Sequence, residues 1–398
     1  MGKKFYTPDG FNDILPEVAA FKREAEAKLR NLFAKYGYME IETPGFEYCD
    51  IYTATDFVGE EDLYKITDQK GRLLAARYDG TVPVARYAAT TYKDYPAPLR
   101  FSYIENMYRF KQMGGGKQSG FTQAGVELMG VKGADSDAEV IALAILSALE
   151  IGVTDLQVSV GQVEIFKGLA RQMKLSEEDT ATVREAINAR DSVTIEKVAS
   201  KLGLSEEDKD VLLMLPEALG TYDVLEELRG KVKDETAAKA LDHLKEILDI
   251  LTDYDLIKYV NVDLGLAGSE DYYTGMIFKG YTYEVGFPII SGGRYDNVVK
   301  KFGRDLEAVG FSLGLSLAIT ALARQDKEFP KARAEAIVGY DRHIKGARRN
   351  ALVLAQSLRA DGTSVIFDSS AMTEDELEAY SEKMEIPATF FVNQGEEE

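Results

Sequence analysis

The chain has 398 residues, 45% hydrophobic and 29% charged, which is enough for one large core and a second, smaller one. Its formal net charge of −20 opposes nucleic-acid binding, because phosphate backbones are bound through clustered Lys and Arg. The single cysteine, Cys49, excludes an intrachain disulfide, and no run of about 18 apolar residues predicts a membrane-spanning helix. We therefore expect a cytoplasmic protein that binds neither nucleic acid nor membrane and holds no metal or other cofactor.

The first predicted element is a long amphipathic helix over residues 16–36, where apolar residues recur at helical spacing. Pro16 suits the first helical position, and Gly37 suits the residue that ends the helix. Short alternating segments then predict strands at 38–42, 63–67, 73–77, 99–110, 123–130 and 259–264, with a hairpin over 274–290. Together these elements indicate an α+β fold, a mostly antiparallel sheet with flanking helices.

Residues 165–250 change to a helical pattern almost throughout, and we expect them to form an insertion between two strands of the sheet. The sequence Leu-Ser-Glu-Glu-Asp occurs there twice, at 175–179 and 204–208. Both copies predict helix starts, because Ser176 and Ser205 can cap a helix and the acids that follow favour the positive end of its dipole.

The chain has only two histidines, His243 and His343, and they lie in unrelated contexts. This excludes most histidine-dependent catalysis and histidine-rich metal sites. His243 falls within a helical period of the insertion, so we predict that it is a residue of the helix surface.

The last part of the chain, residues 332–398, alternates as strand, helix, strand, helix, strand, which predicts a small parallel sheet. From Lys331 onward there are 8 Lys and Arg against 13 Asp and Glu, so this part is acidic, 8 − 13 = −5. We expect two domains, 1–325 with the helical insertion and 332–398.

Several motifs carry a resemblance to a known family. They are the stretches 99–111, Phe121-Thr-Gln-Ala-Gly-Val-Glu127, Leu266-Ala-Gly-Ser-Glu-Asp-Tyr-Tyr-Thr-Gly275 and Ser291-Gly-Gly-Arg-Tyr-Asp296. In this order and at these spacings, they resemble the histidyl-tRNA synthetases, which are class II enzymes. The resemblance covers nearly the whole chain and implies the class II sheet, with 332–398 as a truncated, acidic form of the anticodon-binding domain.

The resemblance also implies a histidine-binding pocket. A ligand with an ammonium group and an imidazole ring needs carboxylates and amides on one side and hydroxyls or aromatic rings on the other. The matching positions that offer such groups are Asp79, Thr81, Arg109, Gln123, Glu127, Tyr272 and Tyr273. Gln123 and Glu127 are four residues apart and would project to the same face of a strand. The alternative is that these are satisfied polar residues of the sheet.

The positions at which the family activates ATP differ. Lys111 replaces an acid, and Ser119, Gly268 and Leu317 stand where the family has arginines. Synthetases stabilise a phosphate transition state with such charges, and losing one commonly costs about 10²–10³ in rate. The sequence therefore predicts an amino-acid-binding site without catalytic residues.

This profile, with phrases such as Ser136-Asp-Ala-Glu-Val-Ile-Ala-Leu143, is similar to the regulatory subunits of ATP phosphoribosyltransferase. The resemblance implies a self-dimer that joins a short-form catalytic subunit in a hetero-octamer, takes histidine as its effector and transmits feedback inhibition. An active histidyl-tRNA synthetase and another amino-acid:ATP ligase of the same fold are the alternatives, and both need the missing ATP contacts.

Overall fold

The computed structural model describes residues 6–55, 57–110, 118–266, 272–329 and 333–395. The chain divides into two compact units. The first contains Met1–Ile14 and Phe21–Glu328, and the second contains Leu15–Ala20 and Phe329–Glu398. Within the described ranges, no helix is long and apolar enough to cross a lipid bilayer.

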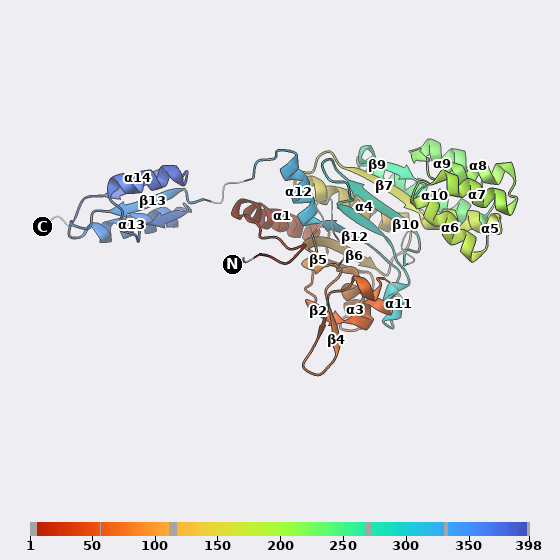
Figure 1. Cartoon of the computed structure of the whole chain (residues 1–398), viewed down its shortest axis with the longest axis horizontal. Helices are drawn as coiled ribbons and strands as arrows, with labels where there is room; N and C mark the ends of the chain where they lie inside the picture. The colour runs from red at the N-terminus through yellow and green to blue at the C-terminus, as the bar shows by residue number, and fades with distance from the viewer. Residues whose placement is uncertain (1–5, 56, 111–117, 267–271, 330–332, 396–398) are drawn as a thin grey trace, which may run out of the picture. The chain divides into compact units, whose positions relative to one another are not determined.

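A nine-stranded sheet with the order β1-β5-β6-β12-β11-β10-β7-β9-β8 forms the centre of the first unit (Figure 1). Its strands are β1 (Met39–Glu40), β5 (Leu99–Tyr108), β6 (Gly120–Met129), β7 (Gln157–Gln162), β8 (Leu219–Gly220), β9 (Val260–Asp263), β10 (Met276–Tyr281), β11 (Ile290–Arg294) and β12 (Ala308–Gly314). Only the pairs β1–β5 and β7–β9 are parallel among them. The predicted α+β fold with a mostly antiparallel sheet is confirmed.

Helix α1 (Pro16–Lys35) follows the predicted range closely. Its buried residues, Phe21, Ala25, Leu29 and Phe33, recur every four positions and so form one apolar stripe. The ring of Phe33 meets that of Phe311 in β12 at 6.2 Å between centroids. The chain then turns at Gly37, whose φ of 77° is a conformation that glycine adopts without strain.

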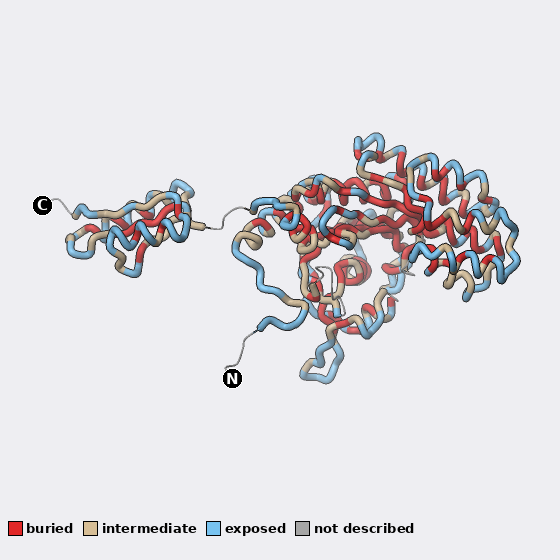
Figure 2. Tube along the Cα trace, turned by 45° about the horizontal axis from the view of Figure 1, so that its top comes forward, coloured by how far each residue is buried: buried red, intermediate tan, exposed pale blue. Residues whose placement is uncertain are grey.

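A smaller sheet follows α1 and has the order β2-β4-β3, with β2 (Phe46–Tyr48), β3 (Lys65–Thr67) and β4 (Leu73–Ala76). The strands β3 and β4 fall within or close to the predicted strands 63–67 and 73–77, and they pair as an antiparallel hairpin. It projects from the first unit, and its end is exposed (Figures 1 and 2). The short helices α2 (Cys49–Thr53) and η1 (Glu60–Asp62) lie between its strands in sequence, and α3 (Thr81–Ala89) follows it.

The predicted helical insertion consists of α5 (Val163–Gln172), α6 (Glu177–Asn188), α7 (Ser192–Leu202), α8 (Glu206–Met214), α9 (Tyr222–Arg229) and α10 (Glu235–Asp253). The side chain of Ser176 accepts a hydrogen bond from the amide of Asp179, and that of Ser205 accepts one from the amide of Asp208. Both predicted caps are therefore confirmed.

The prediction that His243 is a residue of the helix surface is only partly correct. Its Nε2 is 2.8 Å from Oδ2 of Asp137, a fully buried carboxylate of α4 (Ala134–Glu150), and only about a quarter of its side chain is exposed. Sequence periodicity describes one helix at a time, and the partner of His243 is 106 residues away in the sequence.

The remaining helices of the first unit are η2 (Ile257–Tyr259), α11 (Val298–Lys301) and α12 (Leu315–Arg324). Figure 2 shows buried stretches running through the centre of this unit, where α4 and the sheet meet. Strand β6 is buried at eight consecutive residues, so both of its faces are covered. Polar groups on β6 are therefore held inside the protein.

The second unit contains β13 (Ala336–Tyr340), α13 (Ala347–Ala360), β14 (Val365–Phe367), α14 (Glu374–Lys383) and β15 (Ala388–Val392). Its strands form a parallel sheet with the order β14-β13-β15, as predicted. Ile337 clusters with Leu377 of α14, whereas Val338 clusters with Ala351 of α13. Since neighbouring residues of a strand point to opposite faces, the two helices cover opposite faces of this sheet.

Candidate functional site

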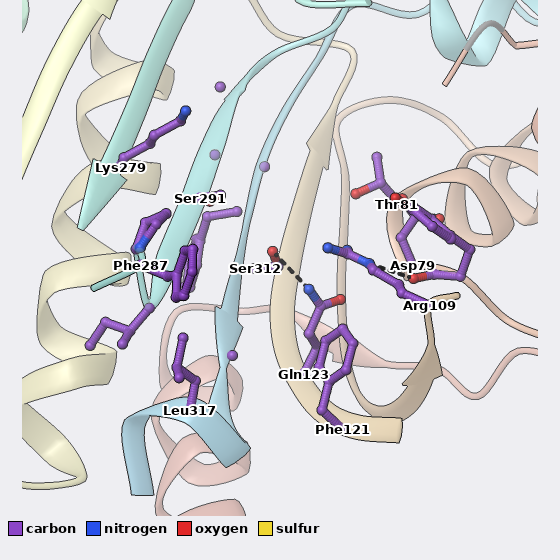
Figure 3. A pocket seen from close by; sticks show the side chains of 18 of the residues that line it. Asp79, Thr81, Arg109, Phe121, Gln123, Lys279, Phe287, Ser291, Ser312 and Leu317 are labelled. Carbon is purple, nitrogen blue, oxygen red and sulfur yellow. Dashed lines mark hydrogen bonds between the residues drawn. The ribbon is translucent and has the colours of Figure 1, made fainter. Parts of the chain in front are cut away.

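A cavity with a volume of about 230 Å³ opens on the central sheet of the first unit. Its walls come from β5, β6, β10, β11 and β12 and from the start of α3 (Figure 3). The predicted site residues that line it are Asp79, Thr81, Arg109, Gln123, Tyr272 and Tyr273. The structure therefore brings together side chains from segments almost 200 residues apart.

The segment that carries Asp79 and Thr81 passes tightly over Tyr103 of β5. A side chain at Gly80 would overlap the Tyr103 ring, so only glycine allows this path. Arg77, just before it, donates hydrogen bonds to the carbonyl oxygen of Thr43 at 2.6 Å and to Glu105 at 2.7 Å. These contacts hold the cavity-lining residues in place from the side of β5.

Glu127 lies beneath the cavity and is fully buried. The hydroxyl of Thr81 donates to its Oε1 at 2.8 Å, and the hydroxyl of Tyr295 donates to its Oε2. Burial raises the pKa of Glu127 to about 8, although the two hydroxyl donors act in the opposite direction. Gly310 is paired with Glu127 across β12 and β6, and a Cβ there would overlap the carboxylate.

Gln123 presents an amide oxygen to the cavity (Figure 3). Its Nε2 donates weakly to the hydroxyl of Ser312 at 3.4 Å, whereas its buried Oε1 has no hydrogen-bond partner among the described residues. Leaving a buried acceptor unmatched costs stability, so a ligand N–H would be a favourable partner.

The two predicted tyrosines form an aromatic wall. The ring centroids of Tyr272 and Tyr273 are 4.2 Å apart, and those of Phe57 and Tyr272 are 4.4 Å apart. An added Cβ at Gly293 of β11 would lie 2.7 Å from the Tyr273 ring, so the glycine makes room for that ring. The arrangement offers flat surfaces to a planar ligand.

Arg109 is half-buried and lines the cavity. Its Nε donates to the carbonyl oxygen of Tyr78 at 3.1 Å, and its guanidinium lies over the rings of Tyr78 and Phe121 at 4.6 and 5.3 Å. A guanidinium fixed in this way has a defined orientation and suits a carboxylate partner.

The other end of the cavity is lined by residues of different character. Leu317 lies there, at one of the predicted loss positions, with Phe287 and Ile289. Ser119, a second such position, is buried, and its amide donates to the carbonyl oxygen of Gly10. The other two, Lys111 and Gly268, lie outside the described residues.

Tyr295 is the residue of this site that the sequence prediction left out. It lines the cavity and donates to Glu127, yet it stands within the motif Ser291–Asp296 that carried the resemblance. This motif therefore contained the information needed to predict Tyr295 as a site residue. Among the residues that the structure describes, no group of three or more His, Cys, Asp or Glu is arranged to hold a metal ion.

Comparisons with known proteins agree with the fold described above. The family model for histidyl-tRNA synthetase matches residues 10–317. A regulatory subunit of ATP phosphoribosyltransferase from Acetivibrio thermocellus is 43% identical over 366 residues, 92% of this chain and 87% of the relative. A solved structure from Bacillus halodurans, described as an ATP phosphoribosyltransferase regulatory subunit/histidyl-tRNA synthetase, is 31% identical and covers 100% of both chains with a TM-score of 0.89. Histidyl-tRNA synthetase from Nostoc, with a TM-score of 0.82 over 97% of this chain and 90% of that one, is 21% identical and shows the shared fold.

Proposed function

This chain belongs to the ATP phosphoribosyltransferase regulatory subunits, a family with the histidyl-tRNA synthetase fold, and we propose that its cavity binds free histidine as a feedback inhibitor. It is a regulatory subunit that serves histidine biosynthesis rather than an active synthetase. The single observation that carries the proposal is the cavity itself, which is lined by the acid Asp79, the amide of Gln123 and tyrosines at one end and by the apolar Leu317 at the other.

In the proposed complex, Asp79 pairs with the α-ammonium group and Gln123 accepts a ligand N–H through its Oε1. Tyr272 and Tyr273 face the imidazole ring, and Arg109 holds the carboxylate. Thr81 and Glu127 complete the site from below, where they are joined by a hydrogen bond of 2.8 Å. Each group of histidine thus has a partner of matching chemistry.

We also propose that the chain forms no histidyl adenylate and charges no tRNA. Adenylate formation places negative charge on a phosphate, and Leu317 cannot stabilise it. The acidic second unit, predicted to begin near residue 332, is a poor surface for RNA.

The proposed partner is a short-form ATP phosphoribosyltransferase catalytic subunit, joined in a hetero-octamer, with this chain dimerising through its N-terminal helix and strands. One face of the small sheet supports the dimer. Tyr48 pairs with Leu74 in β4, and Leu74 pairs with Ile66 in β3, so their side chains share a face. Tyr48 is 43% exposed and Ile66 is 50% exposed, which is costly unless another surface covers them.

The test is inhibition of the reconstituted complex by histidine. The purified chain is mixed with the short-form catalytic subunit, and turnover is followed as histidine is added. Histidine should inhibit the complex that contains the wild-type chain. The complex with Asp79→Asn should have the same turnover without histidine but should resist inhibition by it. Equal inhibition of both proteins would place the effector site outside this cavity.

A further inference from the structure

Glu127 has surroundings that do not suit a charged group. It is fully buried, no described Lys or Arg forms an ion pair with it, and only two uncharged hydroxyls among the described residues favour its ionised form. The charge of Asp79 acts on it and has the same sign. Burying an ionised carboxylate without a cation is expensive, so the neutral acid is favoured.

The titratable groups around Glu127 point the same way. Burial raises its pKa to about 8, and the negative charge of Asp79 raises it further. Tyr38, Tyr103 and Tyr295 also interact with it electrostatically, and burial raises the pKa of each phenol, so none supplies a positive charge or gives up its proton easily.

The proton on Glu127 controls which way two cavity hydroxyls point. Thr81 and Tyr295 both line the cavity, and each has one O–H donor and two acceptor lone pairs. When Glu127 is ionised, both hydroxyls donate to it and offer only lone pairs to a ligand. When Glu127 is neutral, its own O–H donates to one of them, and that hydroxyl is free to donate into the cavity.

We propose that Glu127 is a neutral carboxylic acid that positions a cavity hydroxyl, Thr81 or Tyr295, to donate a hydrogen bond to an unprotonated ring nitrogen of the ligand. Asp79 alone then supplies the negative charge that pairs with the ammonium group of the ligand. This inference rests on the proposed histidine function and specifies its selectivity. The site takes an α-amino acid whose ring is neutral and carries an acceptor nitrogen. Glu127 is a positioning residue, and Gly310 provides the space in which it sits.

The first test detects the proton on Glu127 in the absence of ligand. Infrared difference spectra of wild type minus Glu127→Gln, recorded at pH 7, should contain the carbonyl band of a protonated carboxylic acid. The glutamine variant is nearly isosteric and keeps a donor and an acceptor at this position, so it should fold. A difference spectrum with carboxylate bands alone would overturn the proposal.

The second test compares histidine affinity by calorimetry at pH 7 in wild type, Glu127→Gln and Asp79→Asn. Because a neutral amide can replace a neutral acid, Glu127→Gln should bind within about threefold of wild type. Asp79→Asn removes the counter-charge and should lose about a hundredfold or more, the usual scale for breaking a buried charge pair. An equal loss in both variants would show that Glu127 is an ionised counter-ion and would reject the proposal.

Two further outcomes separate this inference from the function on which it rests. Tyr295→Phe and Thr81→Val identify the donating hydroxyl, because the variant that loses it should weaken histidine binding at every pH between 6 and 8. If neither variant weakens it, the proposed role of the hydroxyls is wrong. If wild type binds no histidine, the proposed function fails, and the infrared band still decides the charge state of Glu127.

Discussion

The guanidinium of Arg294 donates two hydrogen bonds to a single oxygen of Asp137, from Nε at 3.0 Å and from a terminal nitrogen at 2.5 Å. The other oxygen of Asp137 faces His243 at 2.8 Å. Asp137 has no exposed surface, so these partners replace the water that it loses on folding. The contact joins β11, which lines the cavity, to α4 and α10.

Arg294→Met should lower the free energy of unfolding by about 3–5 kcal/mol, because it leaves Asp137 buried with one partner in place of two. Urea unfolding followed by circular dichroism measures the loss. The matched control is Lys239→Met, which removes one member of an exposed ion pair with Glu235 and should leave the midpoint unchanged. A loss of similar size in both variants would mean that the buried ion pair contributes no more to stability than the exposed one.

The stability of the chain should depend on pH through Glu127. Its pKa rises from an ordinary 4.5 to about 8 on folding, so between these values the folded chain keeps a proton that the unfolded chain has released. The free energy of unfolding therefore falls as pH increases through this window, by up to about 1.4 kcal/mol per pH unit from this group. Denaturant midpoints of wild type and Glu127→Gln, measured from pH 5 to pH 8, should diverge, with the flatter profile in the variant. Parallel profiles would contradict the prediction.

Gly310→Ala should damage both stability and the cavity floor, since its Cβ would overlap the Glu127 carboxylate. Forcing a methyl group into a packed site costs about 1–3 kcal/mol, and displacing Glu127 should weaken histidine binding as well. Gly286→Ala is the matched control, because no atom lies within 4 Å of the added Cβ there. Melting temperature and histidine titration would be measured for both. A Gly310→Ala protein with the stability and histidine affinity of the control would show that the backbone shifts at little energetic cost to make room for the methyl group.

Wild-type protein should show no histidine-dependent exchange of pyrophosphate into ATP. The physical reason is the apolar Leu317 in the cavity, which leaves the developing phosphate charge without a stabilising cation at that position. The single variant Leu317→Arg should remain inactive, since Ser119, another of the changed positions, is buried away from the cavity lining. Exchange above background at micromolar protein would contradict the prediction.

Ile66→Lys should convert a self-dimer to a monomer in light scattering, because it places a charge on the exposed apolar face of the small sheet. Val193→Lys provides the control: Val193 is 61% exposed on α7, where a lone apolar residue is ordinary and a charge should change nothing. An unchanged mass for Ile66→Lys would place the dimer interface elsewhere.

Local rules predicted much of the fold from sequence. Ser176 and Ser205 were assigned as caps because a cap depends on residues three positions apart, and both hydrogen bonds are present. The position of His243 could not be predicted in this way, because its partner Asp137 belongs to another helix. The contact between Glu127 and Gly310 beneath the cavity could not be predicted from sequence either. It depends on the register of β6 and β12, which pairs residues 183 positions apart.

Glycines also give the cavity its shape. Gly292, Gly293 and Gly310 all line it, and the space that their missing side chains leave is taken by Phe278, Tyr273 and Glu127 respectively. The hollow is therefore formed partly by main chain, which rotamer changes cannot enlarge. A single methyl group at any of these positions would displace the side chain that now fills the space, whereas a glycine has no side chain to remove. At the proposed histidine site, substitutions of these three glycines can therefore add atoms to the wall but cannot remove any.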